Sequence, residues 1–325
     1  MQSVVQALDP SFLAEVASRV ATIAVAIGVG VFLANVAVAF GAVRYITVLA
    51  YPLTRPANLP REVGTAILTT TASTTAGYGM LAEFRDSGML DDRATLVAVT
   101  INTFFGFVQH IFTFYAPVLI PILGLRVGLM YVGARAAIAL GITLVGILAG
   151  ALLLSGRNVN SEALPDEIDA PDREAQSTPE KLRGAATSTW KKLRRIVPRL
   201  AVVYALVTLL VETNSLQALT SAADPLATLV GLPGAAVPVI AVFAFDTTTG
   251  AVTIAPQIGS VFTPRQAVAT MLLGGIVSFA VSTFKRSIPF QYGIWGASFG
   301  SKVVAVNTAL KVVFIGVAVA VLLVP

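Results

Sequence analysis

Long apolar segments alternate with short polar ones along the whole chain. Six of the apolar segments have roughly the 20 residues that a helix needs to cross a bilayer, and they lie near residues 20–40, 94–114, 128–154, 196–212, 265–284 and 302–324. Because a chain inside lipid must satisfy its own backbone hydrogen bonds, such segments form helices. The pattern therefore predicts an all-α polytopic membrane protein with six full crossings.

A hydroxyl-rich stretch interrupts this apolar pattern twice. The first runs from Thr69 to Gly79 and the second from Asp246 to Gly250. Serine and threonine offer the backbone alternative hydrogen bonds and glycine permits non-helical torsions, so a helix can open there. At membrane depth an open helix is tolerated only where protein or a water-filled cavity surrounds it. We expect the two stretches to line one central site, in segments that are either re-entrant hairpins or interrupted spans.

The two halves of the chain repeat one pattern of proline, glycine and hydroxyl residues. In the first part of the pattern, each matched residue of the first half has its counterpart 173 positions later in the second half. After a deletion of one residue in the second half, the match continues at a distance of 172 positions. Agreement in order over about 75 residues is the signature of a duplicated unit. The matched pairs include Pro52 and Pro225, Thr74 and Thr247, Gly77 and Gly250, Pro117 and Pro289, Gly124 and Gly296, and Gly128 and Gly300.

A charged segment separates the two units. We expect residues 1–154 to form the first membrane unit, residues 155–195 a linker that is acidic at first and then basic, and residues 196–325 the second membrane unit. Each unit should hold about three full spans, a broken helix or re-entrant hairpin, and an interfacial half-helix. Residues 1–16 predict a short amphipathic helix on the lipid surface.

The distribution of Lys and Arg predicts the orientation in the membrane. With the N-terminus outside and the linker 155–199 in the cytoplasm, 17 of the 22 Lys and Arg residues fall in cytoplasmic segments. Such an asymmetry follows the positive-inside rule and is expected of a multi-pass protein of the cell membrane. Three crossings in each unit would insert the two units in opposite senses, so we expect inverted repeats, the plan of many secondary transporters.

Composition narrows the classes of function. The chain is 56% hydrophobic and 12% charged, its mean hydropathy is +0.82, and it has no cysteine. Its net charge of +5 comes mostly from loops and membrane-flanking positions, so nucleic acid is not an expected partner. No Lys or Arg precedes Arg19, and a cleavable signal peptide is therefore not expected. The lipid bilayer is the evident partner. The composition neither predicts nor excludes a homo-oligomer.

The expected substrate site draws on both hydroxyl-rich stretches. A carboxylate at membrane depth is costly, so Asp246 is a functional candidate. It could bind a coupling Na⁺ or proton, or serve as a helix cap or ion-pair partner. The candidate substrate-binding residues are Ser73, Thr74, Thr75, Asn102, Gln109, Asp246, Thr247, Thr248, Thr249, Lys285 and Arg286.

Other ionisable side chains have two interpretations each. Lys285 and Arg286 could hold an anionic group or anchor the cytoplasmic end of a span. His110 could relay protons for coupling or be a satisfied polar group. Arg135 and Lys311 lie at similar depths in the last span of each unit, where either could pair with the carboxylate of the second stretch or with the linker-side surface.

Several of these segments resemble the Gate, or nucleoside-recognition, domain. The resemblance covers both units, outside the linker and the N-terminus. The domain occurs in concentrative nucleoside transporters, in the membrane part of bacterial ferrous-iron transporters, in spore-maturation proteins and in uncharacterised archaeal membrane proteins, and this chain is most similar to the last group. The residues that carry it are 73–81, 98–104, Pro117, Pro121, Gly124 and Gly128 in the first unit, with 287–290, Gly293, Gly296 and Gly300 in the second.

These observations favour a secondary transporter of a small polar solute, nucleoside-like or anionic and phosphate-bearing, with a midplane site between two inverted repeats. The alternative is a non-transporting membrane scaffold or partner subunit, which the resemblance to spore-maturation proteins implies. An enzyme is not predicted, because the chain has no cysteine, one histidine and no evident nucleophile–base pair. No metal site and no cofactor are expected apart from a coupling ion.

Overall fold

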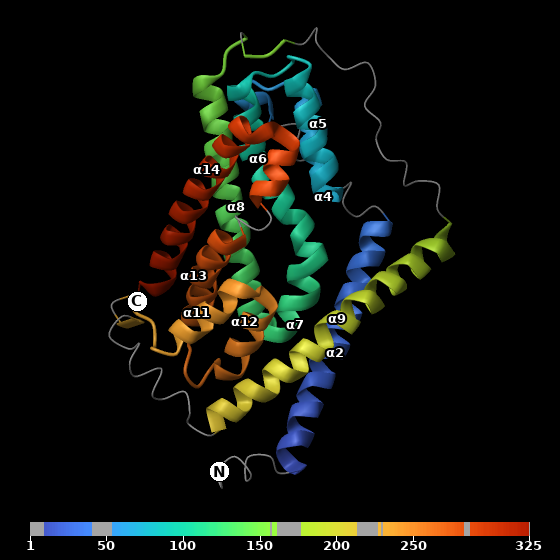
Figure 1. Ribbon diagram of the computed structural model, residues 1–325, viewed down its shortest axis with the longest axis vertical. Helices are drawn as coiled ribbons and strands as arrows, with labels where there is room; N and C mark the ends of the chain where they lie inside the picture. The colour runs from blue at the N-terminus through green and yellow to red at the C-terminus, as the bar shows by residue number, and fades with distance from the viewer. Residues whose placement is uncertain are drawn as a thin grey trace.

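The computed structural model describes residues 10–40, 54–156, 158–160, 177–212, 227–228, 230–282 and 287–324. These residues are almost entirely helical (Figure 1). In chain order the helices are α2 (Pro10–Ala39), η2 (Arg55–Ala57), α4 (Arg61–Ala72), α5 (Thr74–Asp86), α6 (Asp92–His110), η3 (Ile111–Leu119), α7 (Ile120–Leu123), α8 (Leu125–Leu153), α9 (Thr178–Glu212), α11 (Ala236–Phe245), α12 (Thr247–Ile254), η4 (Ala255–Gln257), α13 (Pro264–Ser282) and α14 (Ile288–Leu323).

Both hydroxyl-rich stretches interrupt a helix at a single residue. Ser73 separates α4 from α5 with extended torsions of φ −149° and ψ 109°, and Asp246 separates α11 from α12 with φ −152° and ψ 123°. Gly77 lies against the backbone of Ala66 in the preceding helix, so α5 folds back on α4. Gly250 lies in the same way against Phe243 of α11. The interrupted segments are therefore helical hairpins rather than straight broken spans.

The elements after the hairpins also recur at matching positions of the two units. Helix α6 and helix α13 are each 19 residues long and begin at equivalent positions, 92 and 264. A break follows in each unit at a glycine with positive φ, Gly124 at 77° and Gly296 at 72°. Only glycine adopts such torsions without strain. In Figure 1, α8 ends near α5, whereas α14 ends at the level of α11 and α12, towards the other end of the molecule.

The helical segment that begins with α6 runs further than the sequence predicts. The predicted span ends before Pro117, but the chain stays helical to Leu123. Residues Ile111–Leu119 adopt the wider π-helical turn, with Pro117 inside it. A π turn accommodates the missing proline N–H without ending the helix. The helix ends instead at Gly124, where the backbone takes torsions that other residues avoid.

Two boundaries at the edges of the units differ from the sequence-based prediction. Helix α9 is continuous from Thr178 to Glu212, so the predicted linker boundary at 195 falls inside a helix, and Pro198 is accommodated within it. Helix α2 already begins at Pro10, so the end of the predicted lead-in and the first span form one helix. The predicted interfacial segments cover 43–62 and 216–231, and their parts at 43–53, 216–226 and 229 lie outside the described residues.

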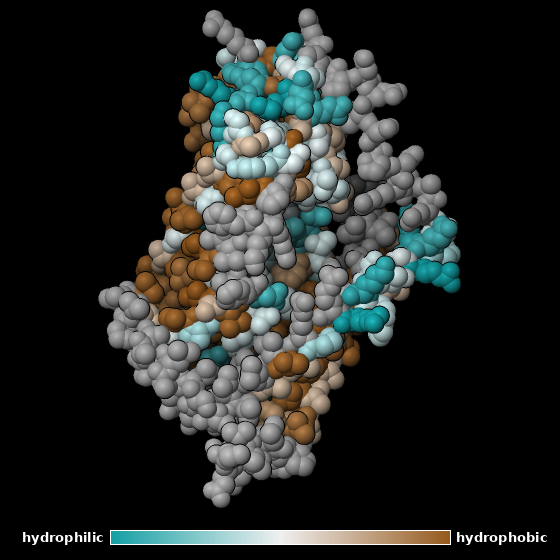
Figure 2. Space-filling model, viewed as in Figure 1, coloured by the Kyte–Doolittle hydropathy of each residue, from teal (hydrophilic) through white to brown (hydrophobic). Residues whose placement is uncertain are grey.

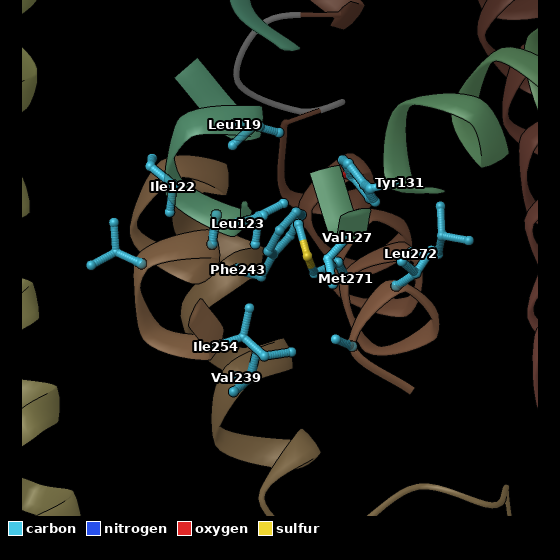
Figure 3. Close-up of a cluster of buried hydrophobic side chains, with 14 of the residues drawn as sticks. Leu119, Ile122, Leu123, Val127, Tyr131, Val239, Phe243, Ile254, Met271 and Leu272 are labelled. Carbon is cyan, nitrogen blue, oxygen red and sulfur yellow. The ribbon is translucent and has the colours of Figure 1, made fainter. Parts of the chain in front are cut away.

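Two clusters of buried apolar side chains occupy opposite ends of the helical body. One involves α4, α5, the start of α6, and the first part of α14. The larger one joins η3, α7, α8, α11, α12 and α13, and includes α2. Figure 3 shows part of the larger cluster, where Leu123 and Val127 point towards Phe243 and Met271.

Four helical stretches in the described part of the chain are long and apolar enough to cross a membrane: Phe12–Leu33, Asp92–Leu123, Leu125–Leu153 and Phe290–Leu323. Figure 2 shows apolar residues covering the face over α14, while polar residues gather at the end near α5 and along the first half of α9. An apolar flank below a polar end is the surface expected of a protein embedded in lipid. The structure thus supports a helical membrane protein.

Candidate functional site

Two adjoining cavities lie at the centre of the helical body. The first has a volume of about 210 Å³ and borders α5, α6, η3, α8 and α14. The second, of about 190 Å³, borders η3, α8, α11, α12, α13 and α14. Four residues line both cavities, namely Tyr115, Arg135, Lys311 and Ile315. The two cavities are therefore lobes of one site, separated by these side chains.

Equivalent positions of the two units line the two lobes. Thr74, which directly follows the first helix break, lines the first lobe, and Thr247, which follows the second break, lines the second lobe. In three further pairs of equivalent positions, the residue of the first unit lines the first lobe and the residue of the second unit lines the second lobe. These pairs are Thr103 and Gly275, Gly106 and Ser278, and Phe107 and Phe279. The duplicated sequence thus produces two related half-sites.

The three hydroxyl residues at the first helix break make different contacts. The hydroxyl of Ser73 caps α5 by accepting the Ala76 N–H at 3.3 Å, which satisfies one of the helix's unpaired donors. Thr74 donates its hydroxyl to the side-chain oxygen of Gln109 at 2.8 Å, at the edge of the first lobe. Thr75 is exposed and lines neither lobe. Of the three hydroxyl residues, Thr74 contacts the cavity.

The second break is capped by a carboxylate. Asp246 Oδ1 accepts the backbone N–H of Thr249 at 2.7 Å and the Thr249 hydroxyl at 2.8 Å. An N-terminal acid also interacts favourably with the helix dipole. The capping role predicted as one alternative for Asp246 is thus present, and its neighbour Thr247 lines the second lobe. Thr248 lines neither lobe.

Two basic side chains lie in the wall shared by the lobes. Arg135 donates to the Tyr115 hydroxyl at 2.9 Å, and the ammonium of Lys311 lies 4.3 Å from the centre of the Phe279 ring. All ion pairs between described residues involve Arg85 or Lys302 instead. Neither Arg135 nor Lys311 therefore pairs with a carboxylate in the described part of the chain, and the alternative in which one pairs with Asp246 is not seen.

Buried polar groups with unused hydrogen-bonding capacity border the first lobe. The Asn102 side chain is 1% exposed, and neither its oxygen nor its nitrogen makes a hydrogen bond of good geometry, although the Tyr78 hydroxyl lies nearby. The Thr103 hydroxyl is also buried without a partner. Leaving such groups unsatisfied costs about 1–3 kcal/mol each. A polar ligand in this lobe would supply the missing hydrogen bonds once these side chains turn towards it, because each of their polar atoms now has less than 1 Å² of accessible surface.

The remaining candidates are placed as follows. His110 lines the first lobe although its side chain is exposed. Lys285 and Arg286 lie outside the described residues. No group of three His, Cys, Asp or Glu side chains in the described ranges is arranged to hold a metal ion.

Some lining residues are absent from the binding set that the sequence predicts. Thr103, Tyr115 and Asn307 carry no strong sequence signal, because isolated polar residues in apolar spans also join helices together. Arg135 and Lys311 are conspicuous as charges inside spans, but their convergence depends on how α8 and α14 pack. Asn102, which the sequence analysis names as a substrate-binding candidate, lines the first lobe.

Comparison with known proteins gives relatives without a described activity. An uncharacterised protein of Methanocaldococcus jannaschii is 25% identical over 282 residues, which cover 86% of each chain. A second uncharacterised protein of the same organism is 24% identical over 288 residues, or 87% of this chain and 91% of the relative. No protein-family model and no solved structure matches the chain. The resemblance to the Gate domain therefore stays a prediction.

Proposed function

We propose that this protein is a secondary transporter that carries a small polar solute across the cell membrane through its two-lobed central site. The observation that supports this most strongly is the position of the lobes. Both are lined by the first residue after a helix break, Thr74 in one unit and Thr247 in the other. Broken helices at a central polar site are a recurring design of secondary transporters.

The depth of the site agrees with a midplane position. Ala139, which lines the first lobe, is the middle residue of the 29-residue helix α8. Lys311 occupies the corresponding position in the part of α14 after the Gly296 break. A helix of 29 residues is about 43 Å long, so its centre lies deep within a bilayer. A solute held there would be reachable from either side after modest helix movements.

We further propose that the two units are inverted repeats. Helices α6 and α13 have matching bounds at a shift of 172 residues, the helix breaks recur at Gly124 and Gly296, and in Figure 1 α8 and α14 end towards opposite ends of the molecule. Inversion supplies two related half-sites, one for each side of the membrane. Exchange between two equivalent packings of the units gives alternating access without any catalytic step. In this proposal the protein is a Gate-domain transporter rather than an enzyme, and Na⁺ or H⁺ is the coupling ion.

The test is transport by the purified protein in lipid vesicles. Labelled uridine, succinate and orthophosphate serve as probes, with gradients of Na⁺ or H⁺ imposed in turn. Ala139→Phe places a bulky ring in the first lobe and should abolish flux. Leu140→Phe is the matched control, because Leu140 is the next residue on α8 and its side chain is exposed.

The expected result is uptake of at least one probe by the wild type and by Leu140→Phe, and none by Ala139→Phe. Thermal unfolding of each variant shows whether loss of flux reflects loss of folding. If every probe gives only the background leak of empty vesicles while the protein is folded, the transporter proposal fails. The non-transporting scaffold would then be the better explanation.

A further inference from the structure

The wall between the two lobes concentrates positive charge. Arg135 and Lys311 both line both lobes and interact electrostatically with each other. Two like charges repel more strongly inside a protein than in water because the local dielectric constant is lower. No carboxylate among the described residues forms an ion pair with either side chain. An anion between the two cations would replace this repulsion by attraction.

The cations sit in a group of four positions on two packed helices. On α8 these are Arg135 and Ala139, and on α14 they are Asn307 and Lys311. Each pair is one helical turn apart and faces the same side. In the duplicated pattern Arg135 corresponds to Asn307, and Ala139 corresponds to Lys311. Each unit thus contributes one cation from a different turn, and all four side chains line the first lobe.

Further hydrogen-bond donors surround this charge. The Tyr115 hydroxyl accepts from Arg135, so its own proton is available for a ligand. The buried Asn102 amide and the Thr103 hydroxyl border the same lobe, and neither makes a hydrogen bond of good geometry. Carboxylate and phosphate oxygens accept several hydrogen bonds at once, and guanidinium and ammonium groups bind them with charge-assisted bonds. The donors present match an oxyanion better than a neutral solute.

The size of the site limits the ligand. The lobes measure about 210 and 190 Å³, below the range of roughly 300–1,000 Å³ typical of sites for drug-sized ligands. Each lobe is large enough for a phosphate ion or a carboxylate of a few carbon atoms. The basic wall is common to both lobes, so an anion could pass from one to the other while it stays close to a cation.

We propose that the solute bound at this site is a small oxyanion, a carboxylate or a phosphate, held between Arg135 and Lys311 with Asn102 and Thr103 as additional donors. This inference rests on the proposed transport function for its biological meaning, but the binding itself is tested separately. The same oxyanion chemistry occurs on free anions and on the headgroups of anionic lipids.

The experiment measures binding of orthophosphate, acetate and succinate to the detergent-purified full chain by isothermal titration calorimetry, with uridine as a neutral comparator and NaCl at matched ionic strength. Arg135→Gln and Lys311→Gln remove one cation each. Arg126→Gln is the matched control, because Arg126 lies on the same helix with its side chain exposed. Loss of one charge-assisted hydrogen bond should weaken binding by about ten- to a hundredfold.

The proposal predicts that at least one oxyanion binds, that both Gln variants weaken it at least tenfold, and that Arg126→Gln binds as the wild type does. Thermal unfolding of the two variants without ligand shows whether weaker binding reflects loss of folding. Binding of uridine alone, or anion binding unchanged in Arg135→Gln and Lys311→Gln, would overturn the proposal. Anion binding without flux in vesicles would instead count against the transport function.

A final arm separates the two sources of oxyanion. The protein is placed in nanodiscs of neutral phosphatidylcholine, with or without phosphatidylglycerol, and orthophosphate binding is measured in each. Phosphate affinity that is equal in both indicates a free anion as the ligand. Phosphate affinity that falls when phosphatidylglycerol is present indicates that a lipid headgroup enters the site between the cations. No phosphate binding in either disc would contradict the proposal.

Discussion

Gly77 offers a direct test of how the first hairpin is built. A β-carbon at this position would lie 2.7 Å from the backbone oxygen of Ala66 and 2.7 Å from the backbone nitrogen of Thr70, and would overlap the Thr70 hydroxyl. Gly79, two residues later on the same helix, has no atom within 4 Å of such a carbon. The substitutions Gly77→Ala and Gly79→Ala therefore make the same chemical change in a crowded and an open place.

The magnitudes follow from two opposing effects. Alanine in place of a helical glycine stabilises a protein by about 0.5–1 kcal/mol, and this is the whole effect expected at Gly79. At Gly77 the crowding atoms belong to the backbone of α4, so they cannot yield without moving that helix, and overpacking costs about 1–3 kcal/mol. The net change for Gly77→Ala is a loss of about 1–2 kcal/mol, so the two variants should differ by roughly 2 kcal/mol.

Thermal unfolding followed by circular dichroism in detergent measures the difference. One kcal/mol moves the Tm of a domain of 150–250 residues by about 2–4 °C, so Gly77→Ala should melt several degrees below Gly79→Ala. Equal melting temperatures, or a more stable Gly77→Ala, would refute the close packing of α5 on α4. The comparison needs no knowledge of the ligand.

Two further predictions concern contacts between elements distant in sequence. The Asp92 carboxylate pairs with Arg85 at 2.7 Å and with Lys302 at 2.9 Å. Its side chain is 44% exposed, and such exposed ion pairs contribute about 0.2–1 kcal/mol each. Asp92→Asn should therefore lower the Tm slightly at low salt, and the difference in Tm from the wild type should disappear at high salt. Thr143 is fully buried, and its hydroxyl accepts the Phe104 N–H at 3.1 Å. Thr143→Val should lower the free energy of unfolding by about 1–3 kcal/mol, measured by chemical or thermal unfolding. An unchanged free energy of unfolding would show that this hydrogen bond is not needed.

The helix breaks could be predicted because their signals are local. Ser73 and Asp246 each end one helix and cap the next, and small hydroxyl and carboxylate side chains do this through their own neighbouring backbone. Gly124 and Gly296 mark the next breaks because only glycine takes their positive φ angles without strain, but these two breaks were not among the predictions from the sequence. The duplication of the sequence places these features at matching positions in the two units.

Local signals failed where packing decides the outcome. Pro117 predicts a helix end, yet a π-helical turn carries the chain past it. The change from basic to apolar residues near 195 predicts a boundary between linker and span, yet α9 runs through both. At Pro117 the packing of an otherwise apolar helix against its neighbours overrides the local break signal, whereas α9 continues from a charged, mostly exposed first half into an apolar second half.

The sequence by itself determined a helical membrane protein whose chain repeats one pattern and is interrupted at two hydroxyl-rich stretches, since hydropathy and torsional preference belong to single residues and short segments. The tertiary structure alone decided that Arg135 and Lys311 lie together in the wall shared by the two lobes. Residues far apart in the sequence meet there because α8 and α14 pack against each other. Such proximity depends on how whole helices pack, and packing is a property of the surfaces that many residues form together.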